Sequence, residues 1–215
     1  MRARFTTDEI AAAALRIVDE SGLSALSMRS LAAALGTGAM TVYNYVADKE
    51  GLEELVVAAV VAEIELPRPS KDWRRDVHAI ADAMWCSGRA HPAAIPLVMT
   101  RRTVSATGMA AADALVGALA RGGLTDLDLL AAFQAVIAYI VGAAQTELTG
   151  LLARPDDTRD PADVAARLRL LAGGAYPHVE ALSHIIAGTS VEEDFDRGLR
   201  MLIDGIATRT PRKRR

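Results

Sequence analysis

The stretch "SMRSLAAALGTGAMTVYNYVADKE", residues 27–50, contains two short helical patterns separated by a glycine-containing turn. Ser27 can cap a helix that ends near residue 35, and residues 39–46 can form a second helix after the break at residues 36–38. Two short helices joined by a turn of three or four residues are typical of a helix-turn-helix. The stretch therefore predicts that motif.

The same region lacks negative charge. No Asp or Glu occurs from Ser21 to Ala47, although the 215-residue chain has 27 acids and a net charge of −3. On a helix over residues 39–46, Val42 and Val46 share the inward face because they are four residues apart. The outward face and its two shoulders then carry Met40, Asn44, Thr41, Tyr45 and Tyr43.

Double-stranded DNA would explain each of these side chains. Asparagine can pair with an adenine edge, methionine and the threonine methyl suit a thymine methyl, and tyrosine hydroxyls reach phosphates. The N–H groups at the start of a following helix over residues 48–65 would offer a further phosphate site. An ordinary small helical core with half-buried tyrosines is the alternative. The candidate DNA contacts are Arg29, Met40, Thr41, Tyr43, Asn44, Tyr45 and Lys49.

The rest of the chain also has helical periodicity, and no segment has a convincing strand pattern. A capping box at Thr6 to Glu9 starts a helix over residues 7–20. The prolines at residues 67–70 mark a domain boundary. Further helices are expected at residues 73–90, 93–99, 105–121, 126–153, 162–171, 177–186 and 191–208.

The predicted fold is all-α, with an N-terminal three-helix helix-turn-helix domain and a C-terminal helical domain for ligand binding and dimerisation. The first domain covers residues 1–66, with 48–65 as a linking helix, and the second covers residues 71–208. The basic tail, residues 209–215, is expected to be disordered.

Composition favours a cytoplasmic protein. Cys86 is the only cysteine, which excludes an internal disulfide, and acids among the first twenty residues exclude a signal peptide. Charges are expected to interrupt every long helix before an apolar run reaches the 18 residues that span a bilayer, so no membrane partner is predicted.

No catalytic motif is present in the sequence, and four scattered histidines do not indicate a metal site. Cys86, beside Trp85 on a predicted helix, is expected to be a core residue. The prediction is therefore no enzyme, no metal and no cofactor. Two other classes stay open: a helical enzyme that binds a small molecule in its C-terminal domain, and an architectural protein that binds a partner without an effector.

Residues 6–55 resemble the DNA-binding region of the tetracycline-repressor (TetR) family of bacterial transcription regulators. The resemblance is carried by Gly22, Leu26-Ser27-Met28-Arg29, Leu31-Ala32, Leu35-Gly36, Val42-Tyr43, Tyr45-Val46, Lys49 and Leu52. It implies that the short third helix enters the major groove, and that Arg29, Thr41, Tyr43, Asn44, Tyr45 and Lys49 contact DNA. The C-terminal half is similar to the tetracycline-repressor subgroup through "GLTDLDLLAAFQAVIAYIVGAAQTE" and "FDRGLRMLIDGI". The histidine that binds the drug's metal ion in that subgroup aligns near Val98 of this chain. This departure argues against metal-chelated tetracycline as a ligand.

An apolar stripe on the last helix and another on the long helix before it predict a homodimer interface, as a palindromic operator requires. The alternative is an intramolecular core. The predicted interface residues are Leu130, Ile137, Val141, Phe195, Leu199, Leu202 and Ile206. Gly198 and Gly205 lie beside the stripe and would permit close approach.

A pocket for a small-molecule effector is predicted from the few large or polar groups that cluster between residues 84 and 139. Each of them could instead be ordinary core. The candidate lining residues are Met84, Trp85, His91, Ile95, Met99, Thr103, Met109, Gln134 and Tyr139. Together the expectations describe a ligand-responsive repressor released from its operator by an effector.

Overall fold

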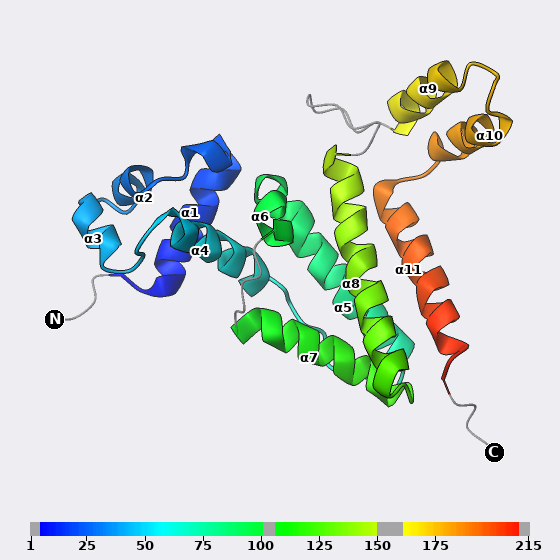
Figure 1. Cartoon of the computed structure of the whole chain (residues 1–215), viewed down its shortest axis with the longest axis horizontal. Coiled ribbons are helices and arrows are strands. Elements are labelled where there is room, and N and C mark those ends of the chain that lie inside the picture. Colours follow the sequence, from blue (N-terminus) through cyan, green and yellow to red (C-terminus); the bar gives the residue numbers. More distant parts are fainter. Residues whose placement is uncertain (1–4, 101–105, 150–160, 211–215) are drawn as a thin grey trace. The chain divides into compact units, whose positions relative to one another are not determined.

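The computed structural model describes residues 5–100, 106–149 and 161–210, and every regular element in these ranges is helical (Figure 1). The predicted all-α class is therefore confirmed. Packing divides the chain into two compact units, Met1–Thr125 and Asp126–Arg215.

The first unit begins with the predicted helix-turn-helix and its supporting helix. Its first elements are α1 (Thr7–Ser21), the 3₁₀ turn η1 (Leu23–Ala25), α2 (Met28–Ala34), α3 (Ala39–Tyr43) and α4 (Lys49–Ala62). Thr6 and Glu9 form the expected capping box, and Ser27 caps α2 through a hydrogen bond from the Ser30 N–H. Short helices need tertiary packing to persist, and here α1 packs on α2 and α4.

A single apolar core holds these helices together. Ile10, Val18, Leu31, Val42 and Leu52 are all almost completely buried in it, and they come from four different helices. Burying a large aliphatic side chain stabilises a fold by about 1.5–3 kcal/mol. This cluster therefore stabilises short helices that would be marginal on their own.

The same unit continues with α5 (Trp73–Ala90), the 3₁₀ turn η2 (Pro92–Ala94), α6 (Ile95–Thr100) and α7 (Ala106–Arg121). Helix α4 packs on α5, α6 and α7, and Ala94 and Leu97 belong to the apolar core of the helix-turn-helix region. The proline-rich segment at residues 67–70 therefore separates two parts of the sequence that share one packed unit.

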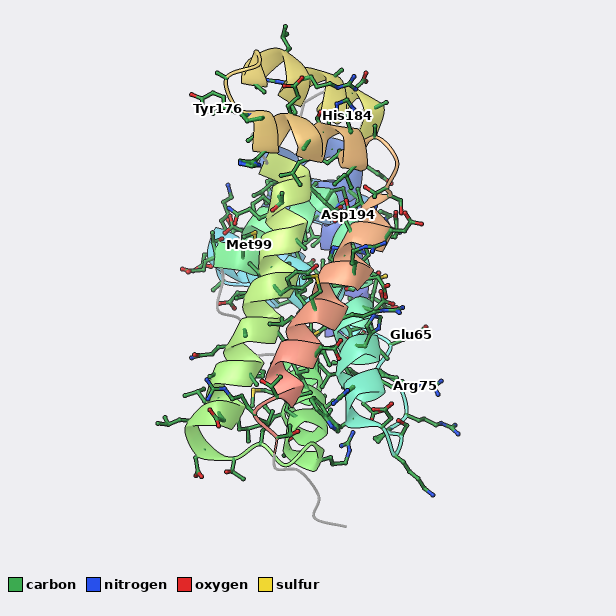
Figure 2. The ribbon with its side chains drawn as sticks, turned by 90° about the vertical axis from the view of Figure 1, so that its right-hand side faces the viewer. Glu65, Arg75, Met99, Tyr176, His184 and Asp194 are labelled. Atoms are coloured by element: carbon green, nitrogen blue, oxygen red, sulfur yellow. The ribbon has the colours of Figure 1, made fainter. Side chains whose placement is uncertain are left out.

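The second unit contains α8 (Asp126–Thr149), α9 (Pro161–Ala172), α10 (Pro177–Ile186) and α11 (Val191–Ala207). Helices α9 and α10 pack on each other, and α11 packs on α8. Figure 2 shows α8 and α11 side by side, with Asp194 at the start of α11 and with Tyr176 and His184 in the α9–α10 hairpin. Ser190 and Glu193 form a capping box that starts α11.

Helix α8 overturns one expectation from composition. Residues 129–146 contain no charged side chain, and an 18-residue window within Asp126–Glu147 has a mean hydropathy of 1.9. By length and composition alone, α8 could cross a membrane, whereas no such run was expected. The core helices of soluble proteins have the same composition, and α8 packs against α11 through part of its surface.

Candidate nucleic-acid interface

The turn between α2 and α3 is closed by backbone hydrogen bonds. The Thr37 N–H donates to the Ala32 carbonyl oxygen at 2.9 Å, and the Gly36 N–H donates to Ala33 at 3.1 Å. Gly36 has a φ of 61°, a left-handed conformation that glycine adopts without steric cost. This residue therefore allows α2 to stop and α3 to start within a few residues.

Helix α3 is shorter than the predicted 39–46 because its regular part ends at Tyr43. Helix-like hydrogen bonding nevertheless continues, since the N–H groups of Tyr45 and Val46 both donate to the Val42 carbonyl oxygen, at 2.9 and 3.1 Å. Val42 and Val46 consequently share the buried face, as the periodicity predicts.

The side chains predicted to face outward from α3 are exposed, and those predicted on its shoulder are less so. Met40 is 78% exposed and Tyr43 is 50% exposed, and Asn44 is also exposed. Thr41 and Tyr45, on the shoulder, are partly buried. Since no acid lies between residues 21 and 47, this surface presents apolar, amide and hydroxyl groups without a carboxylate of its own segment.

Tyr45 has a role inside the domain that periodicity did not show. Its hydroxyl accepts a hydrogen bond from the Phe5 backbone N–H at 3.1 Å, and the two rings meet edge to face with centroids 6.5 Å apart. Tyr45 therefore links the residue before α1 to the end of α3, which makes it different from the exposed Tyr43.

The start of α4 carries more negative charge than a simple phosphate site would. Asp48 accepts a hydrogen bond from the Gly51 N–H at 2.9 Å, and Glu50 lies in the first turn. Lys49 is well exposed, but its ammonium lies 4.0 Å from the Glu53 carboxylate. The expectation that α4 offers vacant N–H groups to a phosphate is thus only partly met, because carboxylates already stabilise this helix end.

Arg29 is exposed on α2.

The predicted pocket residues have different environments. Trp85 and Ile95 are buried, Met84 and Met99 are partly buried, Met109 and Gln134 are exposed, and Thr103 lies outside the described residues. His91 and Tyr139 form specific internal hydrogen bonds instead of presenting unused polar groups. Gln134 and Tyr139 belong to the second compact unit, whereas the others belong to the first.

The predicted dimer residues also separate into two groups. Leu130 and Val141 are exposed, and Ile137, Leu202 and Ile206 are partly buried. Phe195 and Leu199 are buried within one chain, where α11 packs on α8, so for these two the intramolecular reading is the correct one. Of the predicted set, Leu130 and Val141 are the residues that stay exposed in one chain.

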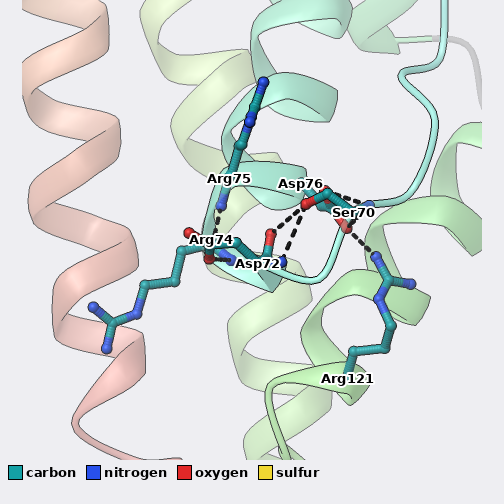
Figure 3. Close-up of polar contacts among 6 residues, drawn as sticks. All are labelled: Ser70, Asp72, Arg74, Arg75, Asp76 and Arg121. Atoms are coloured by element: carbon teal, nitrogen blue, oxygen red, sulfur yellow. Dashed lines mark hydrogen bonds and ion pairs between the residues drawn. The ribbon is translucent and has the colours of Figure 1, made fainter.

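One buried polar cluster was missed by the sequence reading. Asp76 is almost fully buried on α5, and its two carboxylate oxygens accept hydrogen bonds from the Ser70 N–H at 3.0 and 2.9 Å and from the Arg121 guanidinium (Figure 3). Burial disfavours the charged form, but the Ser70 and Arg121 hydrogen bonds prevail and lower the pKa of Asp76. The segment before α5 is thereby attached to α5 and α7.

No cluster of three or more metal-ligating side chains occurs among the described residues. Cys86, whose position beside Trp85 suggested a core residue, is instead exposed on α5.

Comparison with known proteins adds two family matches and close relatives. Residues 10–56 match the model for bacterial regulatory proteins of the tetR family, and residues 66–210 match the model for the tetracyclin repressor-like C-terminal domain. The HTH-type transcriptional repressor DrrR1 of Streptomyces coeruleorubidus is 32% identical over 97% of this chain and 80% of its own length. An HTH-type transcriptional regulator of Saccharopolyspora erythraea is also 32% identical, over 94% and 84%.

A solved structure has the same fold. The TetR family protein ActR of Streptomyces coelicolor, crystallised in complex with actinorhodin, superposes with a TM-score of 0.76 at 26% identity. The superposition covers 96% of this chain and 98% of that one. The similarity therefore extends over both family matches and not only over the helix-turn-helix.

Proposed function

Since the chain belongs to the tetracycline-repressor family, and is thus a DNA-binding transcription regulator and not an enzyme, we propose that it represses transcription as a homodimer that a small-molecule effector releases from DNA. Members of this family bind DNA and effectors and dimerise.

The outward face of α3 is the observation that carries the proposal. Met40, Tyr43 and Asn44 are exposed on one short helix whose opposite side, Val42, is buried in the core. The core holds the helix in place, and the exposed side offers the hydrogen-bonding and methyl groups that read base edges in a major groove. Arg29, Thr41 and Lys49 extend this surface, and we assign them and Tyr45 to the DNA interface.

A palindromic operator follows from the proposed dimer. Two copies related by a twofold axis place their α3 helices about 34–36 Å apart, one turn of DNA, when both bind the same side of the duplex. The exposed apolar residues Leu130 and Val141 on α8, with Leu202 and Ile206 on α11, would supply the contact between copies. In this role the uncharged length of α8 serves a protein interface in the cytoplasm, not a membrane.

We place effector binding in the C-terminal region, residues 71–208, where the partly buried Met84 and Met99 offer adaptable apolar surface. ActR, with the same fold, was crystallised with the small molecule actinorhodin. An effector that binds best when the two α3 helices are not one DNA turn apart shifts the population toward that other spacing. It therefore weakens operator binding.

Fluorescence anisotropy with DNA from upstream of the coding region tests the proposal. We expect salt-dependent binding that a suitable small molecule reverses. Asn44→Ala should relax base preference, whereas Lys49→Ala should weaken binding to all sequences similarly and reduce the salt slope by about 1. Lys71→Ala, at an exposed lysine in the segment before α5, is the matched control.

Three outcomes would contradict the proposal. Unchanged operator binding by both Asn44→Ala and Lys49→Ala at moderate salt would remove α3 from the interface. Catalytic turnover of a small molecule without DNA binding would favour the helical enzyme. DNA binding with no ligand that shifts the melting temperature would favour the architectural protein.

A further inference from the structure

His91 lies where three helices of the first unit end. It is the C-cap of α5 and the residue before η2. Asp19 is in the last turn of α1, and Glu63 is the C-cap of α4. Because the C-terminus of a helix carries a partial negative charge, this arrangement favours a positive charge at His91.

Both nitrogens of the His91 ring face carboxylate oxygens. Nδ1 lies 2.9 Å from Asp19 Oδ2, and Nε2 lies 2.7 Å from Glu63 Oε2. Ionised carboxylates only accept hydrogen bonds, and a neutral imidazole has a single N–H to donate. Only the doubly protonated ring can therefore donate to both ionised carboxylates, so this geometry favours the imidazolium.

The hydrogen bonds of His91 with Asp19 and Glu63 attach the start of the C-terminal region to the DNA-binding helices. Immediately after His91, Ala94 and Leu97 enter the apolar core that also contains Ala14 of α1 and Val57 of α4. The His91 side chain is only 12% exposed. Its two ion pairs thus lie beside the contacts that η2 makes with α1 and α4 and that α6 makes with α4.

The two charged groups that contact the ring both favour its protonated form. Asp19 comes from α1 and Glu63 from α4, whereas η2 and α6 contain no titratable side chain. On α5 itself, the neighbouring cation Arg89 lies over the Trp85 ring, 4.7 Å from its centroid. Burial of the ring disfavours the charge, but the hydrogen bonds to Glu63 and Asp19 prevail and raise the pKa of His91 above 6.5.

We propose that Asp19, His91 and Glu63 form a proton-dependent latch that holds the end of α5 and η2 against both α1 and α4. When the ring loses a proton, one carboxylate faces a nitrogen lone pair, and the end of α5 is released from either α1 or α4. His91 is thus a positioning residue that links the C-terminal region to the DNA-binding helices. Only its effect on operator binding rests on the proposed function.

The direction of the pH effect follows from the raised pKa. A group whose pKa is higher in the folded state stabilises that state fully below its unfolded pKa, which is 6.5 for histidine. This contribution is lost as the pH rises through the higher folded value. The latch should therefore stay closed up to pH 6.5 and open as the pH rises through the higher folded pKa.

Two measurements on the full chain without DNA or ligand test the latch. Proton NMR of the histidine rings should show His91 titrating above 6.5, with its signals assigned by their loss in His91→Gln. Hydrogen exchange, corrected for the intrinsic effect of pH, should show protection in the last turns of α1 and α4 falling about tenfold between about pH 6 and pH 9.

Variants separate the latch from ordinary packing. In His91→Gln, which does not titrate and cannot donate to both carboxylates, protection in these two turns should be low at both pH values. His178→Gln, at an exposed histidine of α10, should behave as the wild type. If His91→Gln does not fold, the double variant Asp19→Asn and Glu63→Gln keeps the ring, and His91 should then titrate at lower pH than in the wild type.

Equal protection at both pH values in the wild type, or a His91 ring that titrates below 6.5, would overturn the latch. With operator DNA, the ratio of affinities at about pH 6 and pH 9 should be closer to one in His91→Gln than in His178→Gln. A chain that shows the titration and the exchange change but never binds DNA would retain the latch and refute the repressor.

Discussion

The hydroxyl of Tyr139 on α8 donates a hydrogen bond to the Phe195 carbonyl oxygen on α11 at 2.9 Å, and the two rings lie 5.3 Å apart between centroids. The contact is possible because residue 198 is glycine. A Cβ at Gly198 would overlap with the Tyr139 hydroxyl, whereas a Cβ at Gly205 would meet nothing within 4 Å. Position 198 therefore has no room for a side chain, whereas position 205 has.

Gly198→Ala should destabilise the protein, because the added methyl group forces Tyr139 away from α11. Overpacking of this kind costs about 1–3 kcal/mol. Gly205→Ala is the matched control, and it should leave stability unchanged or raise it by up to about 1 kcal/mol, since alanine favours a helix over glycine. Thermal unfolding measures both. Equal destabilisation by the two variants would mean that space on α11 is limited by something other than Tyr139.

Asp76→Asn should lower stability at neutral pH by about 3 kcal/mol, because it removes the charge that a buried network with Ser70 and Arg121 requires. The pKa of Asp76 is lowered below 3.8, so its contribution is complete above that pH and is lost as the pH falls through the lower folded value. Denaturant unfolding should show a constant difference from wild type above pH 3.8 that shrinks in stronger acid.

The matched control for that variant is Asp82→Asn, at an exposed aspartate of the same helix. A loss of stability as large in Asp82→Asn would show that helix charge, not the buried network, explains the result.

Removing the two tyrosine hydroxyls near α3 should have different consequences. Tyr45→Phe leaves the Phe5 N–H without its acceptor and should cost about 1 kcal/mol of stability. Tyr43→Phe, at a side chain that is 50% exposed, should leave stability unchanged and weaken operator binding. Chemical denaturation and anisotropy, measured on both variants, provide the comparison. The reverse pattern would show that the Tyr43 hydroxyl, and not the Tyr45 hydroxyl, supports the fold.

Leu130→Glu should dissociate the dimer without unfolding the chain, because Leu130 is 50% exposed on α8 and would face the second copy. Leu199→Ala should instead destabilise each chain by about 2–5 kcal/mol, since Leu199 is fully buried within it. Analytical ultracentrifugation and thermal unfolding distinguish these effects. A dimer that survives Leu130→Glu at micromolar concentration would move the interface away from this part of α8.

The sequence predicted the elements well because their signals are local. The helices at Trp73–Ala90 and Pro177–Ile186 have the expected bounds, and Thr6 and Ser27 cap helices as expected. Capping and helical periodicity involve residues three or four apart, so a single segment carries all the information. The same periodicity correctly assigned Val42 to the core and Met40 to the surface.

The wrong predictions rested on local sequence features, which do not show which residues are in contact. Cys86 was expected in the core and is exposed, and α8 was expected to be interrupted by charges and is not. Phe195 and Leu199 lie on the predicted stripe, but they pack within one chain. Periodicity shows which face of a helix is apolar and does not show whether that face meets its own chain or another copy.

By itself the sequence determined the all-helical class, the helix-turn-helix and the chemistry of its outward face. Only the tertiary structure decided which distant groups meet: His91 with Asp19, 72 residues away, Arg121 with Asp76, 45 away, and Tyr45 with Phe5, 40 away. The physical reason is that a helix is specified by hydrogen bonds between near neighbours along the chain. A polar pair between helices depends instead on how their apolar faces pack, and that packing is a property of the whole folded unit.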